Sequence, residues 1–195
     1  MIRTAFVLLG ILLLWPSYAW SQTTWRIAQG PSTVGFKVQH FYFTHVDGVF
    51  RSFNGTVVRS GDDFEGAQIN ASISVASVYT GIPARDEELM QPFFFDAEQH
   101  PDLLFESTSF EHVGDSTYVI TGMLTIRGVT KPIELHAVRH DERIIRDGKR
   151  RVDFLATGRL DRFDFGLEWN KVAEFGNAIV GKMIDITLDV VLIEE

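Results

Sequence analysis

The sequence predicts an all-β protein, an extended eight-stranded antiparallel barrel with one short helix between its third and fourth strands. Apolar and polar residues alternate over eight separate segments, which is the period of half-buried strands. Phenylalanine is the abundant aromatic, with 16 residues against 4 tyrosines, which favours a large dry interior. A two-sheet sandwich would show the same alternation, but closure into a barrel removes the long exposed edge.

The predicted strands follow one another at regular spacing. They cover residues 33–40, 46–59, 69–75, 103–111, 117–127, 132–139, 152–160 and 184–192. The clearest unit is residues 120–138, where two alternating runs flank a Gly-containing loop at 128–131 and form a β-hairpin. Pro132 fits the first position of the returning strand, where its missing N–H costs least.

Two features interrupt the strand pattern. Phe50 and Phe53 cannot share a face under strict alternation, so we expect a β-bulge near Arg51 and Ser52 that turns both rings inward. Residues 84–90 form the one convincing helical stretch, and Pro92 stops it. This short helix, followed by a phenylalanine cluster, predicts a plug or lid.

The N-terminus has the composition of a secretory signal peptide. A short basic start precedes the apolar run 5–15, Pro16 breaks it, and residues 17–19 are small enough for a signal peptidase. The run is shorter than the roughly twenty residues that a spanning helix needs, although an uncleaved anchor is the alternative. We therefore expect residues 1–19 to be a signal peptide and residues 20–195 to be one exported, periplasmic domain.

Composition excludes several classes of function. The sequence has no cysteine, which rules out disulfides, thiolate metal sites and thiol nucleophiles. Its formal net charge is −8, and this acidic balance argues against a nucleic-acid or anionic-membrane binder. We expect no nucleic-acid partner and no stable membrane insertion.

Five segments in order resemble the YceI-like family of exported polyisoprenoid-binding proteins. They are STVGFKVQH (32–40), GVFRSFNG (48–55), FFDAEQHP (94–101), TGMLTIRGVTKP (121–132) and RFDFGLEWN (162–170). The resemblance implies a lipocalin-like barrel with a long isoprenoid or other aliphatic chain in its lumen. It also implies a periplasmic, non-enzymatic role in lipid or quinone binding, and homodimers occur in such families.

The chain departs from the usual family pattern at two positions. Pro31 and Arg127 stand where the resemblance would place histidines. Both positions lie at strand ends, so they concern the chemistry of a lipid head group more than the barrel. Arg127 would offer a permanently charged, bidentate phosphate donor that histidine could not.

The candidate lipid-binding residues are inward-facing apolar residues together with three polar ones at strand or helix ends. The apolar candidates are Phe36, Val38, Phe50, Phe53, Ile73, Val75, Phe93, Phe95, Phe105, Leu124, Ile126 and Phe154. His40, Arg85 and Arg127 are candidates for the head group. Plain core packing remains the alternative for the apolar set, because alternation cannot distinguish a filled barrel from a hollow one. The alternative for Arg85 is a surface pair with Glu87 or Glu88.

Metal and catalytic sites are not predicted. His136 and His140 are four residues apart in a strand, about 13 Å, which is too far for one metal ion. His40 and His45 lack an evident third ligand. The acidic residues of segment 161–168 could imitate a glycosidase pair, but a capped loop anchored by aromatic residues explains them better.

We therefore expect a carrier or sequestering protein for a polyprenyl phosphate, an isoprenoid quinone or a fatty-acid derivative, without a catalytic residue, metal or cofactor. An enzyme that uses the same cavity and a filled barrel that binds nothing are the alternatives.

Overall fold

The computed structural model describes residues 22–40, 44–168 and 180–195. The predicted signal peptide, 1–19, lies outside these residues. Within them the chain forms eleven strands, one α-helix and two 3₁₀ turns. In chain order these are β1 (Gln22–Ile27), β2 (Thr33–His40), β3 (Thr44–Phe50), β4 (Phe53–Ser60), β5 (Gln68–Ser74), η1 (Val75–Ser77), β6 (Val78–Tyr79), α1 (Pro83–Leu89), β7 (Asp102–Gly114), β8 (Thr117–Ile126), β9 (Val129–Ile144), β10 (Arg150–Asp161), η2 (Arg162–Phe165) and β11 (Val180–Glu194).

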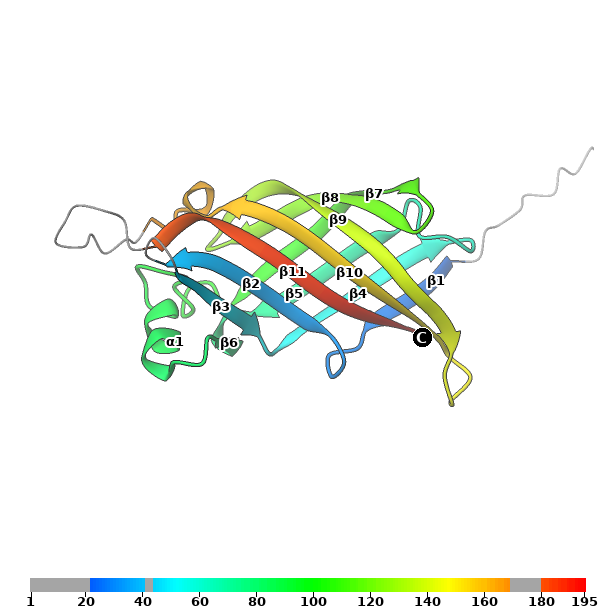
Figure 1. Ribbon diagram of the computed structural model, residues 1–195, viewed down its shortest axis with the longest axis horizontal. Coiled ribbons are helices and arrows are strands. Elements are labelled where there is room, and N and C mark those ends of the chain that lie inside the picture. Colours follow the sequence, from blue (N-terminus) through cyan, green and yellow to red (C-terminus); the bar gives the residue numbers. More distant parts are fainter. Residues whose placement is uncertain (1–21, 41–43, 169–179) are drawn as a thin grey trace, which may run out of the picture.

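The strands form one closed antiparallel barrel, elongated along its axis (Figure 1). Hydrogen-bonded neighbours follow the order β1-β4-β5-β7-β8-β9-β10-β11-β2-β3-β6, and β1 also pairs with β11. Because β1 and β2 both pair with β11, they occupy one strand position that is interrupted between them. β3 and β4 likewise share a position, as do β5 and β6. The eleven strands therefore fill eight positions, and the predicted eight-stranded barrel is confirmed.

Two details of the prediction need correction. β1 was not predicted, and the structure places α1 between β6 and β7 rather than between the third and fourth strands. The difference arises because β1 adds a strand, the predicted strand 46–59 is divided into β3 and β4, and β6 continues the line of β5. In space, α1 covers the end of the barrel where β2 ends and β3 begins (Figure 1).

The irregularity between Phe50 and Phe53 is a full interruption between β3 and β4. Arg51 and Ser52 lie outside both strands, and the two phenylalanines on either side are buried. The extra residues restore the inward parity of both rings, which is the effect expected of a bulge at this place.

The β8–β9 hairpin turns more tightly than the sequence indicated. Ile126 pairs directly with Val129, so only Arg127 and Gly128 form the turn, with φ values of 51° and 73°. Two consecutive positive φ angles define a type I′ hairpin turn. Pro132 pairs with Met123 inside β9 rather than beginning it, and the predicted loop at 128–131 is therefore wrong in length.

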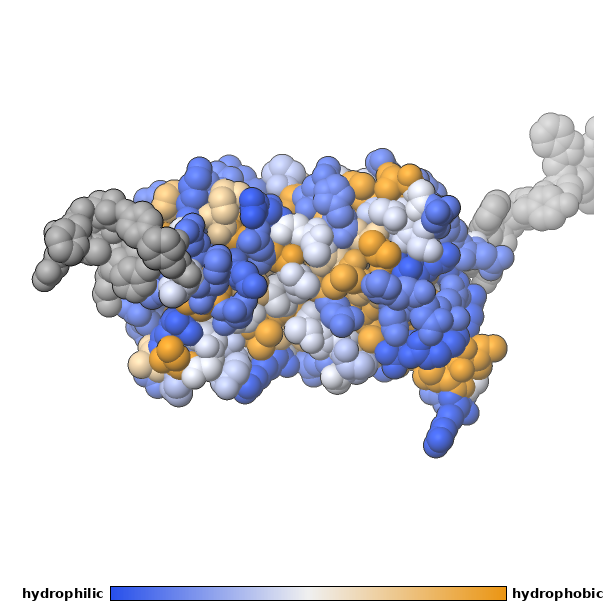
Figure 2. Space-filling view, viewed as in Figure 1, coloured by the Kyte–Doolittle hydropathy of each residue, from blue (hydrophilic) through white to orange (hydrophobic). Residues whose placement is uncertain are grey.

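The barrel buries most of its large apolar residues in its interior. The face shown in Figure 2 is largely hydrophilic, with scattered apolar residues. The buried residues form two clusters. One surrounds Trp25, Phe64 and Tyr118, and the other surrounds Phe50, Leu124 and Phe165 near α1. No helix in the described part of the chain is long and apolar enough to cross a membrane.

Candidate functional site

An apolar cavity of about 500 Å³ occupies the interior of the barrel. Its wall consists of side chains from alternate positions of strands all around the barrel, together with α1 and the segment that follows it. The volume lies within the range of cavities that hold small-molecule ligands. The barrel is therefore hollow, and a filled core does not describe it.

Most of the residues predicted from the sequence line this cavity. They are Phe36, Val38, His40, Phe50, Phe53, Ile73, Arg85, Phe95, Phe105, Leu124, Ile126 and Phe154. Strand alternation places them there, because successive side chains of a strand point to opposite faces of the sheet.

Val75, Phe93 and Arg127 are not among the lining residues. Val75 is completely buried in η1, where it packs in the cluster around Leu124. Phe93 is 44% exposed, and the neighbouring Phe94 lines the cavity instead. The segment after α1 is a series of turns, so the parity of a strand does not apply to it.

Arg127 connects three segments at the α1 end of the barrel. Its guanidinium donates hydrogen bonds to the carbonyl oxygen of Gly166 at 3.0 Å and to that of Pro92 at 2.7 Å. This side chain therefore ties the β8–β9 turn to the segment after α1 and to the end of η2. It does not point into the cavity as a phosphate donor.

Sequence reasoning missed a large part of the wall, contributed by β9, β10 and β11. These additional residues include Leu135, Ala137, Ala156, Leu160, Ile184, Ile186, Leu188, Val190 and Leu192. All lie at the inward parity of strands that were predicted correctly. Extending the alternation argument to those strands would have found them.

The ionisable side chains that line the cavity come from the α1 end: His40, Arg85, Glu88 and Arg162. The Arg85 guanidinium donates to the hydroxyl of Thr80 at 2.8 Å and to the Thr80 carbonyl oxygen at 2.9 Å. Asp86 in turn accepts hydrogen bonds from the amide and hydroxyl of Thr80. Thr80 therefore holds Arg85 in a fixed position at the α1 end of the cavity, in place of the pair with Glu87 or Glu88 considered above.

Arg162 is a buried cation at the same end, only 2% exposed. Its guanidinium donates to the carbonyl oxygens of Gly181 at 2.9 Å, Val180 at 3.3 Å and Leu167. Burial lowers the pKa of this group, since the charged form is desolvated. Arg162 joins the start of β11 to the residues after η2 and places a positive charge beside the apolar wall.

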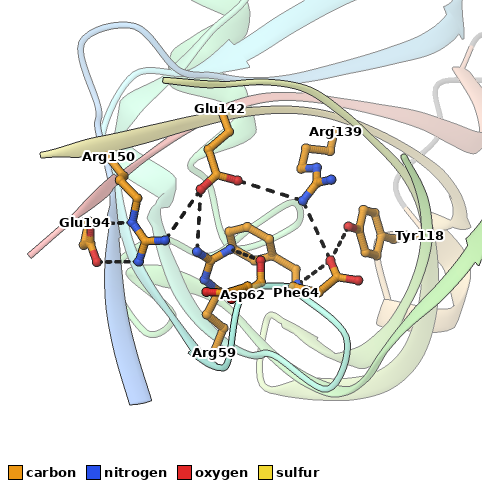
Figure 3. A network of polar contacts seen from close by, with 9 residues as sticks. Arg59, Asp62, Phe64, Tyr118, Arg139, Glu142, Arg150 and Glu194 are labelled. Carbon is orange, nitrogen blue, oxygen red and sulfur yellow. Dashed lines mark hydrogen bonds and ion pairs between the residues drawn. The ribbon is translucent and has the colours of Figure 1, made fainter. Parts of the chain in front are cut away.

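The opposite end of the barrel is closed by aromatic rings and a polar network (Figure 3). Arg59 is 1% exposed and lies over the rings of Trp25 and Phe64, at 4.7 Å and 4.5 Å from their centroids. Burial lowers the pKa of Arg59, and the carboxylate of Glu142, 3.6 Å away, opposes this shift. Arg150 completes this end with a bidentate pair to Glu194. None of these residues lines the cavity.

Other ionisable residues have local structural partners. His136 lies 3.2 Å from Glu134, and residues 22–40, 44–168 and 180–195 contain no group of three His, Asp or Glu side chains placed to hold a metal ion. Asp161 accepts a hydrogen bond from the amide of Phe163 and pairs with Lys182 at 3.2 Å. These contacts match the interpretation of this acidic segment as a capped loop.

Known proteins resemble this chain in both sequence and fold. The model of the YceI-like domain matches residues 25–192. A protein of Pseudomonas savastanoi pv. phaseolicola named UPF0312 protein is 33% identical over 135 residues, which are 69% of this chain and 70% of that protein.

Among solved structures, the YCEI protein of Campylobacter jejuni has a TM-score of 0.69 and 27% identity, covering 82% of this chain and 91% of that one. A polyisoprenoid binding domain from Saccharophagus degradans has a TM-score of 0.63 at 15% identity, over 86% of this chain and 97% of that domain, which shows the common fold. The sequence match over nearly all described strands, and the barrel itself, establish that this chain belongs to the YceI-like family.

Proposed function

We propose that this protein binds a long-chain isoprenoid or a similar aliphatic lipid inside its barrel and carries or sequesters it in the periplasm. The observation that carries the proposal is the cavity of about 500 Å³, whose wall is apolar and whose ionisable side chains gather at one end. A molecule with a long apolar chain and a single polar head matches this distribution.

Burial of the chain supplies most of the binding free energy. Each CH₂ group transferred from water to an apolar wall contributes about 0.8 kcal/mol. The closed end offers the chain only aromatic and aliphatic contacts, so the ligand enters chain first and leaves its head beside α1. Polyprenyl phosphates, isoprenoid quinones and fatty-acid derivatives all have this general shape.

Arg85 is the residue we propose for an anionic head group. Thr80 fixes its position, and guanidinium groups bind phosphate and carboxylate oxygens strongly. His40 lines the same end of the cavity and is a second polar contact for the head.

Family membership supports a binding role over a catalytic one. The name of the Saccharophagus degradans domain describes a polyisoprenoid-binding protein with this fold. The acidic segment that suggested a glycosidase has its Asp161 engaged in capping η2. We propose no catalytic residue, no cofactor and no metal, and a homodimer is compatible with the proposal.

The test is to identify the molecule that occupies the barrel. The exported protein is purified without detergent and extracted with organic solvent, and the extract is analysed by mass spectrometry. We expect an isoprenoid or other long-chain lipid at close to one molecule per chain. Protein that is folded and yields no lipid, and then takes up none of the three lipid classes, would contradict the proposal.

Two substitutions in one strand provide a matched control. Phe154 lines the cavity, whereas the next residue, Leu155, is 37% exposed on the outer face. Phe154→Arg should abolish lipid uptake and Leu155→Arg should not. Ala156→Leu, which narrows the cavity without adding charge, should also reduce uptake and covers the case in which Phe154→Arg fails to fold.

A further inference from the structure

We propose that inward-facing glycines set the width of the lumen, because each gives a large neighbouring side chain room to pack against the barrel wall, and that this width selects methyl-branched chains over straight ones. The inference rests on the proposed function, since it concerns the ligand of the same cavity. It adds the residues that determine the cross-section of that ligand.

Gly48 and Phe36 show the arrangement most clearly. They are directly paired across β3 and β2. A Cβ atom placed on Gly48 would lie 2.2 Å from Cζ of Phe36, 2.6 Å from Cε1 and 2.8 Å from Cε2. The ring therefore occupies the space that a side chain at position 48 would fill, and it covers the backbone of β3 instead of crossing the lumen.

The same arrangement occurs at Gly55, Gly122 and Gly158, and a Cβ on Gly55 of β4 would lie 2.7 Å from Cδ1 of Ile27. A Cβ on Gly122 of β8 would lie 2.4 Å from Cζ of Phe105, and a Cβ on Gly158 of β10 would lie 2.6 Å from Cδ2 of Leu135. Phe36, Phe105 and Leu135 all line the cavity. A glycine inside a strand usually marks a close approach of this kind.

These contacts explain why the barrel is hollow. An eight-stranded barrel is only about wide enough for its own side chains to fill it. Three large side chains that lie along the wall, at the β2–β3, β7–β8 and β9–β10 pairs, leave the centre free. A Cβ atom at any of these glycines would take the space that the neighbouring side chain now fills, and at Gly122 and Gly158 it would also lie 2.6 Å and 2.9 Å from the carbonyl oxygens of Glu106 and Glu134.

The width of the lumen has a consequence for the ligand. An isoprenoid chain carries a methyl branch on every isoprene unit and needs a wider channel than a straight chain of the same length. Narrowing the lumen should therefore weaken binding of branched chains more than binding of straight ones.

The test uses Gly48→Ala, because the three nearest atoms to the new Cβ all belong to the ring of Phe36 rather than to the backbone. Delipidated protein is titrated with geranylgeraniol and with hexadecanol, which have main chains of equal length. We expect the ratio of the two affinities to shift against geranylgeraniol by about tenfold, comparable to one methyl group in a tight pocket. Gly114→Ala is the control, since no atom lies within 4 Å of its Cβ position.

A second substitution gives the opposite change without introducing a clash. Phe36→Leu shortens the side chain over Gly48 and should shift the ratio toward geranylgeraniol, and in the Gly48→Ala background it should restore the original ratio. Folding of each variant is checked by thermal unfolding. An unchanged ratio in Phe36→Leu, or in folded Gly48→Ala, would overturn the inference while leaving the proposed function intact. Wild-type protein that binds neither alcohol would instead overturn the proposed function.

Discussion

Tyr118 and Asp63 are joined across the closed end of the barrel by a hydrogen bond of 2.6 Å, in which the phenol donates to Oδ1 of the carboxylate (Figure 3). Burial of Tyr118 and this bond raise the pKa of the phenol to about 12. Burial alone would raise the pKa of Asp63, but hydrogen bonds from Tyr118 and from the Phe64 amide outweigh it and lower that pKa.

This pair predicts how stability changes at alkaline pH. The pKa of Tyr118 is raised in the folded state, so its contribution is fully present below the unfolded value of about 10 and is lost as pH rises toward about 12. A shift of this size corresponds to a loss of about 3 kcal/mol. Urea unfolding of the wild type between these pH values should show the loss.

Tyr118→Phe is the matched variant, because it keeps the ring and removes the phenol. At neutral pH it should lower the free energy of unfolding by about 1.5–3 kcal/mol, the value of a hydrogen bond to a charged group. Its stability should then fall less steeply above pH 10 than that of the wild type. If the free energy of unfolding falls equally with pH in both proteins, Tyr118 does not cause the loss of stability at alkaline pH.

We expect Phe154 to limit how far a ligand chain extends toward Phe64. Its ring packs at 6.2 Å from Phe110 and at 5.0 Å from Phe64, and Phe64 lies behind the cavity rather than in its wall. Phe154→Ala should open the cavity toward Phe64 and lengthen the chains that co-purify, at a cost of about 3–5 kcal/mol in stability. The chain-length distribution is measured by mass spectrometry.

Phe50→Ala is the control for that measurement, since Phe50 lines the cavity beside Phe95, next to α1. It should reduce affinity without moving the distribution toward longer chains. If Phe154→Ala and the wild type co-purify with lipids of the same chain lengths, Phe154 does not set the length of the bound chain.

Arg85→Ala should affect ligands according to the charge of their head groups. We expect affinity for geranylgeranyl phosphate to fall at least about tenfold, the effect of losing a charge-assisted hydrogen bond, while affinity for geranylgeraniol stays unchanged. Arg51→Ala removes a guanidinium that stacks on Tyr79 and does not line the cavity, and it should change neither affinity. Equal losses for both ligands in Arg85→Ala would show that Arg85 shapes the cavity instead of binding the head.

Arg127 should stabilise the segment after α1 rather than bind ligand. Asparagine tolerates the positive φ of this position but cannot reach both carbonyl oxygens, so Arg127→Asn isolates the loss of the two hydrogen bonds. The hydrogen-bonded amides of residues 94–97 should exchange faster, by an amount equivalent to about 1–2 kcal/mol. Amides at the closed end, such as that of Tyr118, should keep their protection in the same hydrogen-exchange experiment.

Strand alternation was sufficient to predict much of this molecule. Leu124 and Ile126 line the cavity where the pattern of residues 120–138 placed them, and the parity change between Phe50 and Phe53 corresponds to a real interruption. The side of the sheet to which a side chain points depends only on local backbone geometry, so alternation along a strand predicts it well. It fails at Phe93 because no strand exists there.

Other features depend on contacts between distant segments. Arg59 points inward like Phe53 and Val57 of the same strand. The role of a charged residue at such a position becomes clear only when the neighbouring rings of Trp25 and Phe64 are found next to its guanidinium. The turn of Arg127 likewise gives no indication that its side chain reaches Pro92 and Gly166. The sequence alone also does not show why residues 48 and 122 are glycines. The reason becomes visible only when the rings of Phe36 and Phe105 are found next to them.

The interruptions in three neighbouring strand positions lie at the same height of the barrel. The gap between β3 and β4 faces the one between β5 and β6, since Phe50 pairs with Val78 and Phe53 pairs with Ile73. The gap between β1 and β2 lies beside them, and Ser52 bridges the seam by accepting from the Ser74 amide at 2.9 Å. The three interruptions are thus aligned across neighbouring strands of the barrel. At this height the wall is therefore joined by isolated backbone hydrogen bonds, such as those from Ser74 to Ser52 and from Arg51 to Ser77, in place of a continuous ladder.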